Sequence, residues 1–135
     1  MSENEHKYTY ATLILRGKEL NPKDVTDYLG LSPSMSFNRG DWRNETEKWK
    51  HSFWSLSSQN MVQSNDLAFH LEWLIKQLEP VKSKFLEILN EKNIKAEISC
   101  FWILPSEHEN LSLNCQLIKK YTELGLGLNM DIYCP

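Results

Sequence analysis

The strongest constraint in this sequence is an unbroken alternation of apolar side chains over residues 94–104. The intervening side chains are polar up to Ser99, and Phe101 and Ile103 then make the second face apolar as well. Successive residues of an extended strand point to opposite sides, so this pattern predicts a β-strand with one buried face and a cover over the end of the other. The alternating residues are Ile94, Ala96, Ile98, Cys100, Trp102 and Leu104.

Three further segments predict strands. Residues 8–16 are rich in β-branched and aromatic side chains and stop before a glycine. Residues 49–58 place Trp54 and Leu56 on one face, and residues 126–134 alternate again between apolar and polar side chains. We therefore expect a sheet of about four strands.

Two short segments predict helices. Asn21 suits an N-cap, Pro22 suits the first helical position, and Gly30 suits the end of the helix. Residues 113–124 form the second short helix, which ends before Gly125. Its inward residues are expected to be Leu117, Ile118, Tyr121 and Leu124.

Residues 64–92 have the apolar spacing of one long helix. Pro80 interrupts it, but the apolar stripe continues beyond Pro80 without a change of phase, and Pro80 falls on the opposite side. We predict one helix kinked at Pro80, with two abutting helices as the alternative. The stripe consists of Leu67, Leu71, Leu74, Ile75, Leu78, Val81, Phe85, Ile88 and Leu89.

The order of these elements predicts an α+β fold of ferredoxin-like sandwich type. In this fold a mostly antiparallel sheet carries a long kinked helix and two shorter helices on one face. The 135 residues, 41% of them hydrophobic, suffice for one domain that buries about two-thirds of its unfolded surface. We expect a single domain over 1–135, with a polar tail at 1–7 and a core at about 8–134.

Charge and cysteine content exclude several classes of function. A net charge of −3 makes nucleic acid an unlikely partner. No apolar run reaches the roughly 20 residues of a membrane helix, so we expect no membrane partner. The polar first residues and the odd number of cysteines predict a cytoplasmic chain with free, buried thiols, Cys100, Cys115 and Cys134.

No motif predicts catalysis, a metal or a cofactor. The histidines form no metal-binding pair, no glycine-rich loop precedes a helix, and no nucleophile elbow is present. His70 flanks the apolar stripe and is expected to be a boundary residue of the core. An enzyme assembled from dispersed residues stays open, but we do not expect one.

Four features together resemble a known family. They are the opening YATLILRGKELNPKDVTDYLGLSP, the loop at Gly40, the strand FWSLSS and the ending ELGLGLNMDIY. This pattern is similar to a bacterial family catalogued as domain of unknown function 4279. The resemblance spans roughly residues 8–133 and implies a bacterial, cytoplasmic, single-domain protein. It implies no catalytic residues.

The segment 37–54 is the first candidate binding region, because three of the five tryptophans lie in it among several cations. Aromatic and cationic side chains together can stack on rings and hold anions. Acidic residues offset most of the positive charge, so a hairpin whose tryptophans pack on the sheet edge is the competing interpretation. The candidates for binding a ligand or partner are Arg39, Asp41, Trp42 and Trp49.

Phe69 and Trp73 are the second candidate region. They lie one turn apart on the long helix and off its apolar stripe, so they form an aromatic patch on a face that should be wet. Such a patch is typical of an interface with a second copy or a protein partner. The alternative is that residues 32–48 fold over the two rings.

Two hypotheses for function follow. The first is a non-catalytic protein-interaction module, either inhibitor- or immunity-like or homodimeric. The modest net charge argues against the immunity version, since inhibitors of basic enzymes carry concentrated acidic surfaces. The second is a small-ligand binder or enzyme that uses a cleft under the loop 32–49.

Overall fold

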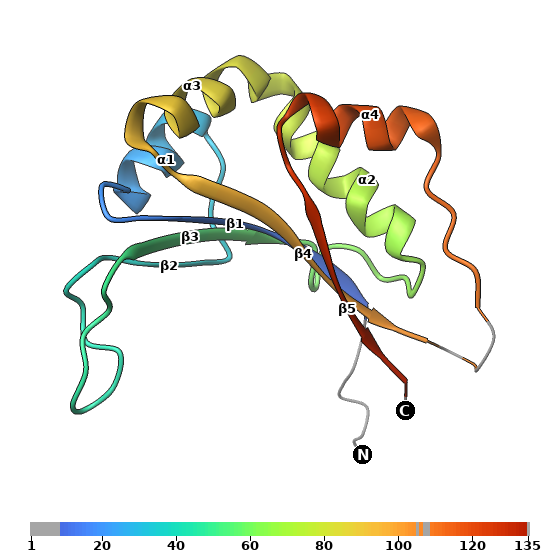
Figure 1. The fold of residues 1–135 in the computed structure, drawn as a ribbon, viewed down its shortest axis with the longest axis horizontal. Helices are drawn as coiled ribbons and strands as arrows, with labels where there is room; N and C mark the ends of the chain where they lie inside the picture. Colours follow the sequence, from blue (N-terminus) through green and yellow to red (C-terminus); the bar gives the residue numbers. More distant parts are fainter. Residues whose placement is uncertain (1–8, 105, 107–108, 135) are drawn as a thin grey trace.

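The chain folds into a five-stranded mixed sheet with helices on one face (Figure 1). The computed structural model describes residues 9–104, 106 and 109–134. The predicted polar tail at 1–7 therefore lies outside the described residues. The elements are β1 (Tyr10–Gly17), α1 (Pro22–Leu29), β2 (Met35–Phe37), β3 (Ser52–Ser57), α2 (Leu67–Leu78), the 3-10 turn η1 (Glu79–Val81), α3 (Lys82–Lys92), β4 (Lys95–Ile103), α4 (Cys115–Glu123) and β5 (Leu128–Tyr133).

The strand order is β2-β3-β1-β4-β5, with β1 at the centre. β1 runs antiparallel to both β3 and β4, and β2 runs antiparallel to β3. β5 runs parallel to β4. This is possible because the connection between the two strands contains α4, which returns the chain to the end of the sheet where β4 begins. The α+β class predicted from the sequence is confirmed, and the predicted strand at 94–104 corresponds to β4.

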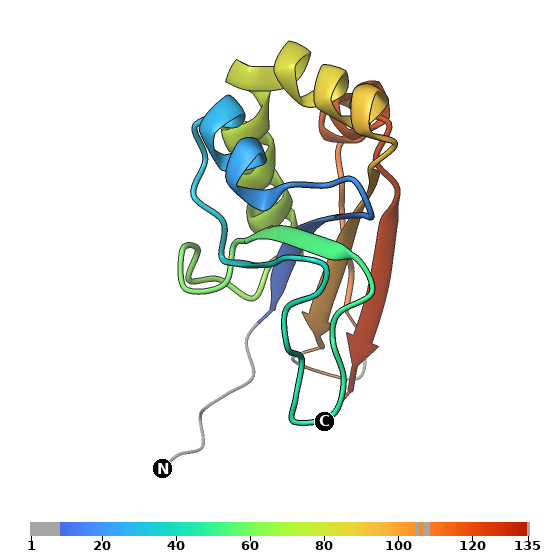
Figure 2. The same ribbon diagram turned by 90° about the vertical axis from the view of Figure 1, so that its left-hand side faces the viewer.

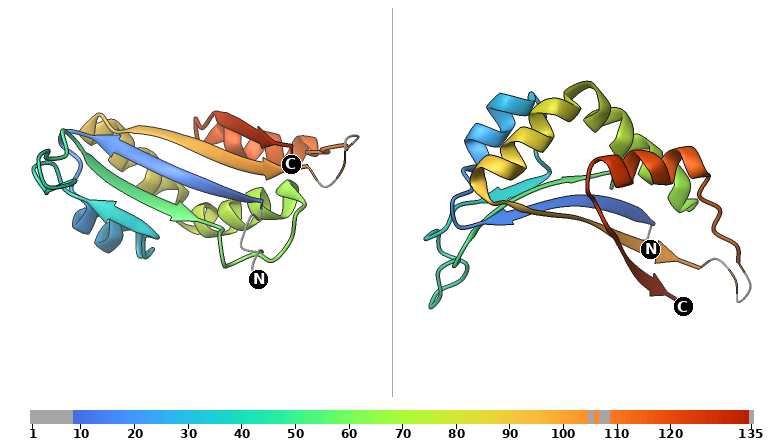
Figure 3. Two further views of the ribbon diagram at one scale, coloured as in Figure 1. Left: turned by 90° about the horizontal axis from the view of Figure 1, so that it is seen from below. Right: turned by 45° about the horizontal axis from the view of Figure 1, so that its top comes forward.

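All the helices lie on one face of the sheet, and the core lies between them and the sheet (Figures 1 and 2). Leu13, Leu15 and Trp54 point from the sheet into this layer and are fully buried. The opposite face carries no described helix, as the view from below in Figure 3 makes plain. The cover expected over Phe101 is therefore missing among the described residues; its ring instead lies 5.5 Å from that of Tyr10.

α1 forms as its local sequence predicts. The Asn21 side chain accepts hydrogen bonds from the backbone N–H groups of Lys23 (3.1 Å) and Asp24 (3.4 Å). Gly30 ends the helix in the left-handed conformation, with φ of 70°, and its N–H bonds to the carbonyl of Thr26. Both predicted ends of this helix are confirmed.

The long helical segment changes direction at Pro80, as predicted. It starts at Leu67 with Asp66 as its N-cap, three residues later than the pattern predicted. The single 3-10 turn η1, which contains the exposed Pro80, joins α2 to α3. The predicted stripe contributes to the hydrophobic core on both sides of this turn, and Phe85 beyond it is fully buried.

Three predicted inward positions are wrong. Ile118 is 48% exposed, because the side of α4 that faces the core carries only Leu117 and Tyr121; these two and Leu124 are buried as predicted. Cys115 and Cys134 are also exposed, whereas Cys100 is buried as expected. Cys134 follows the edge strand β5, whose outer side no described strand covers.

Candidate functional site

The hairpin at residues 38–51 connects β2 to β3 and projects from the end of the sheet, away from the helices (Figures 1 and 2). Its two arms are held by backbone bonds. The Gly40 N–H donates to the Trp49 carbonyl, and the Trp49 N–H donates to the Asp41 carbonyl, both at 2.9 Å. Gly40 has φ of 92°, a conformation that favours glycine. The hairpin therefore has a defined backbone rather than that of an irregular loop.

Polar side chains fix both ends of this hairpin. Near its tip, Asn44 Oδ1 accepts the backbone N–H groups of Thr46 and Glu47, both at 2.9 Å. Near its base, Asp41 Oδ2 accepts the Asn38 N–H at 2.8 Å. The predicted ligand residue Asp41 thus already holds the loop with one of its carboxylate oxygens.

An aromatic stack anchors the hairpin to the sheet edge. The ring of Phe37 lies between the ring of Phe53, at 4.8 Å, and that of Trp49, at 3.8 Å. The guanidinium carbon of Arg43 lies over the Trp49 ring, 5.0 Å from the ring centroid. The interpretation that a tryptophan of this loop packs on the sheet edge is therefore correct for Trp49.

The other two tryptophans of the segment have different environments. Trp54 is fully buried, and its indole N–H donates to Thr26 Oγ1 at 3.0 Å. Trp42 is 64% exposed near the tip of the hairpin, where its only described ring contact is Lys48 Nζ, at 4.7 Å. Trp42 is consequently the candidate ring that is accessible to another molecule.

The four predicted ligand residues share the hairpin but do not converge on one point. Arg39 is exposed, and its backbone N–H donates to Ser52 Oγ at 2.9 Å. Trp49 points to the sheet edge, whereas Trp42 is exposed. Arg39, Asp41 and Trp42 share an exposed position on the hairpin, whereas Trp49 is half-buried, and the four side chains form no pocket.

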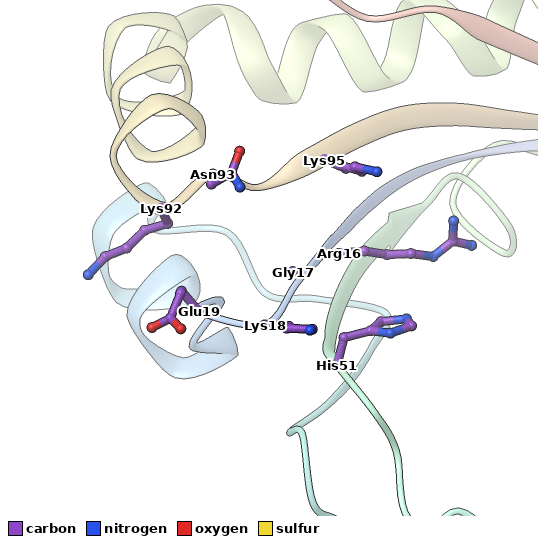
Figure 4. A pocket seen from close by; sticks show the side chains of 8 residues that line it. All are labelled: Arg16, Gly17, Lys18, Glu19, His51, Lys92, Asn93 and Lys95. Carbon is purple, nitrogen blue, oxygen red and sulfur yellow. The ribbon is translucent and has the colours of Figure 1, made fainter.

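A hollow of about 620 Å³ lies at the base of the hairpin (Figure 4). Lys18, His51 and Lys95 extend to the same side of it, and Lys92 extends the other way. Arg16, at its edge, forms an ion pair of 3.2 Å with Glu97. The full lining is Arg16, Gly17, Lys18, Glu19, His51, Lys92, Asn93 and Lys95.

The positive charge of this hollow was not predicted from the sequence. Its residues come from three distant segments, and the strand register brings them together by pairing Arg16 with Lys95 and Gly17 with Ser52. No local motif marks them. Within residues 9–104, 106 and 109–134, Lys18 and Lys95 have no ion-pair partner. The predicted residues of the hairpin do not line this hollow.

The helical candidates Phe69 and Trp73 differ in burial. Phe69 is 53% exposed, so the alternative in which residues 32–48 fold over both rings does not hold for it. Trp73 is partly buried and packs against the core. The exposed part of this patch is therefore mainly the ring of Phe69.

His70 and Ser58 form a hydrogen-bonded pair of the type that catalytic sites use, but both side chains have no exposed surface. His70 Nδ1 lies 2.6 Å from Ser58 Oγ, and Nε2 lies 2.7 Å from the Ser64 carbonyl. A carbonyl only accepts, so Nε2 carries the proton and Nδ1 accepts from the Ser58 hydroxyl. Because no substrate reaches these atoms, the pair is structural.

These features define an α+β domain with an aromatic hairpin and a basic hollow at one end of its sheet. In the part of the chain that the structure describes, no three potential metal ligands gather, and no helix has the length and apolar character to cross a bilayer. The family model of the Domain of unknown function (DUF4279) matches residues 6–135, so the chain belongs to this family. Neither the curated proteins nor the solved structures include a significant match.

Proposed function

We propose that this chain is a non-catalytic protein-interaction module that binds its partner through the hairpin at 38–51. The observation that carries the proposal is Trp42, a tryptophan 64% exposed on a loop of defined structure. Tryptophan and arginine dominate the binding energy of protein interfaces, and Arg39 and Arg43 lie beside it in the sequence.

Preorganisation supports this role. Ordering a flexible loop on binding costs conformational entropy. This hairpin is already held by backbone hydrogen bonds and an aromatic stack, so binding through it loses less conformational entropy. The hairpin carries four Lys and Arg residues and three acidic residues, so its charge is mixed. A protein surface of mixed charge fits this pattern better than a polyanion.

Trp42→Ala tests the proposal, with Met61→Ala as the control because Met61 is equally exposed, at 63%, on another loop. Each variant and the wild type are used to isolate complexes from the cells that produce the protein. We expect one partner to be recovered with the wild type and with Met61→Ala, and to be lost with Trp42→Ala at unchanged melting temperature. Equal recovery with all three proteins would contradict the hairpin as the binding element.

Phe69 and Trp73 remain a second candidate interface of such a module. The support for it is the exposure of Phe69 next to the partly buried Trp73. A partner that survives Trp42→Ala and is lost with Phe69→Ser would assign the contact to this face of α2.

A small anionic ligand in the hollow is the alternative function. The support for it is that Lys18 and Lys95, which line the hollow beside His51, have no ion-pair partner among the described residues. A phosphate or carboxylate group would be held there by charge. Pyrophosphate should raise the melting temperature of the wild type and of Lys119→Gln, but not of Lys95→Gln. No shift with any of them would exclude this alternative.

We further propose that the architecture is a ferredoxin-like sandwich with an added α4–β5 unit, in a single domain over 1–135. Its support is the order β2-β3-β1-β4, in which every pairing is antiparallel and a helix follows β1 and β3. A cytoplasmic location is part of the same proposal, on the odd number of cysteines.

A further inference from the structure

β5 is the longer of the two edge strands of the sheet. β2, at the other edge, has three residues, whereas β5 has six, and no described strand pairs with its outer side. Figure 3 shows β5 at the margin of the sheet. An edge of this length offers a row of backbone groups to another chain.

The backbone of β5 presents its free groups at alternate residues. The carbonyls of Gly127 and Tyr133 accept hydrogen bonds from the backbone N–H groups of Ile98 and Leu104. The backbone N–H and C=O groups of the odd-numbered residues of β5 therefore point toward β4. The N–H and C=O groups of Leu128, Met130 and Ile132 consequently point outward.

The same three residues carry apolar side chains. Met130 is 39% and Ile132 is 54% exposed, on the face that also carries the helices. Natural edge strands are commonly protected by lysine, proline or a bulge. β5 has none of these, and its single charge is that of Asp131.

We propose that β5 pairs antiparallel with β5 of a second copy of this chain, in a register centred on Met130. In this register Met130 lies opposite Met130, Leu128 lies opposite Ile132, and Asn129 lies opposite Asp131. The outward backbone groups of all three even-numbered residues then find partners, and the apolar side chains meet on one face. This interface lies at the edge opposite the hairpin and does not depend on its role.

Neighbouring registers fit less well. A shift by one residue places outward groups opposite inward ones and apolar side chains opposite polar ones. A shift by two residues in one direction places Asp131 directly opposite Asp131, where like charges repel. A shift by two residues in the other direction leaves fewer residues of the two β5 strands opposite each other. The sequence of β5 is thus self-complementary mainly about Met130.

An apolar hollow beside β5 adds to this surface. It lies between α4 and β5, has a volume of about 80 Å³, and is lined by Ile118 and Leu128 among others. Ile118, which the sequence pattern placed in the core, is 48% exposed. A second copy along β5 would cover the apolar surface that this side of the molecule exposes.

Sedimentation of the wild type, of Met130→Lys and of Met35→Lys tests the pairing. Met35 is the matched control, since it is an exposed methionine (59%) on the other edge strand. We expect a dimer for the wild type and for Met35→Lys, and a folded monomer for Met130→Lys, in which two lysines would face each other. A monomeric wild type, or a dimer that persists in Met130→Lys, would overturn the proposal.

Disulfide formation tests the register even where Met130→Lys does not fold. Opposite residues of a hydrogen-bonded antiparallel pair have Cα atoms about 5.5 Å apart, within reach of a disulfide. With Cys115 and Cys134 changed to serine, Met130→Cys should form a covalent dimer on oxidation and Met35→Cys should not. Trp42→Ala should leave this dimer intact, whether or not it loses a partner. Absence of the Met130→Cys dimer, or its loss with Phe69→Ser instead, would overturn the register.

Discussion

His70 is the residue whose role differs most from its sequence pattern. It lies at the edge of an apolar stripe, yet it has no exposed surface and both ring nitrogens have partners. Ser58 Oγ, which donates to the ring, also accepts the Ala11 N–H at 2.9 Å. One imidazole therefore joins α2, the segment before it and the central strand β1. Buried polar groups of this kind stabilise only when all of them are paired.

His70→Ala should lower the free energy of unfolding by about 2–4 kcal/mol. The reason is that it leaves a cavity and removes partners from Ser58 and from the Ser64 carbonyl. His51→Ala, at a half-buried position with no such bond among the described residues, should change this free energy by less than about 0.5 kcal/mol. Urea unfolding of both variants measures the difference. Equal effects would mean that the network around His70 contributes little.

At the scale of elements, the two tryptophans of the hairpin should contribute differently to stability, because Trp49 packs in the aromatic stack and Trp42 is exposed. Trp49 closes the stack on Phe37 and Phe53, so Trp49→Ala should lower the free energy of unfolding by about 1–3 kcal/mol. Trp42→Ala should change it by less than about 0.5 kcal/mol, since its ring is mostly in water. Thermal unfolding followed by calorimetry gives both values. If the two variants were equally stable, the stack would not hold the hairpin.

At the scale of the whole molecule, the sequence predicted single helices and strands, but it did not predict features that depend on how distant strands pair. The alternation over 94–104 and the caps Asn21 and Gly30 act within a few residues, so the sequence was enough to place β4 and α1. A separate alternation over 126–134 predicted β5, but it could not show that β5 lies at an edge with its apolar side chains exposed. The basic hollow depends on the register of β1 against β3 and β4, which no single segment encodes.

The packing of α4 over β4 also sets how the molecule responds to alkali. Burial raises the pKa of the Cys100 thiol from 9.0 to about 12. Burial also raises the pKa of Tyr121, whose hydroxyl donates to the Leu71 carbonyl at 2.6 Å. In both cases the folded state holds a proton that the unfolded chain releases at lower pH.

The stability contributed by the Cys100 proton is therefore fully present below pH 9 and is lost as the pH rises from 9 towards 12, and that contributed by the Tyr121 proton is lost only above pH 10. Each group should lower the free energy of unfolding by about 1.4 kcal/mol per pH unit above its unfolded pKa. Urea unfolding at several alkaline pH values measures this slope. Cys100→Ala should flatten it from pH 9 upward, and Tyr121→Phe should flatten it only above about pH 10, where the free phenol ionises. A slope that neither substitution changes would place the alkaline sensitivity in other groups, outside the layer between α4 and the sheet.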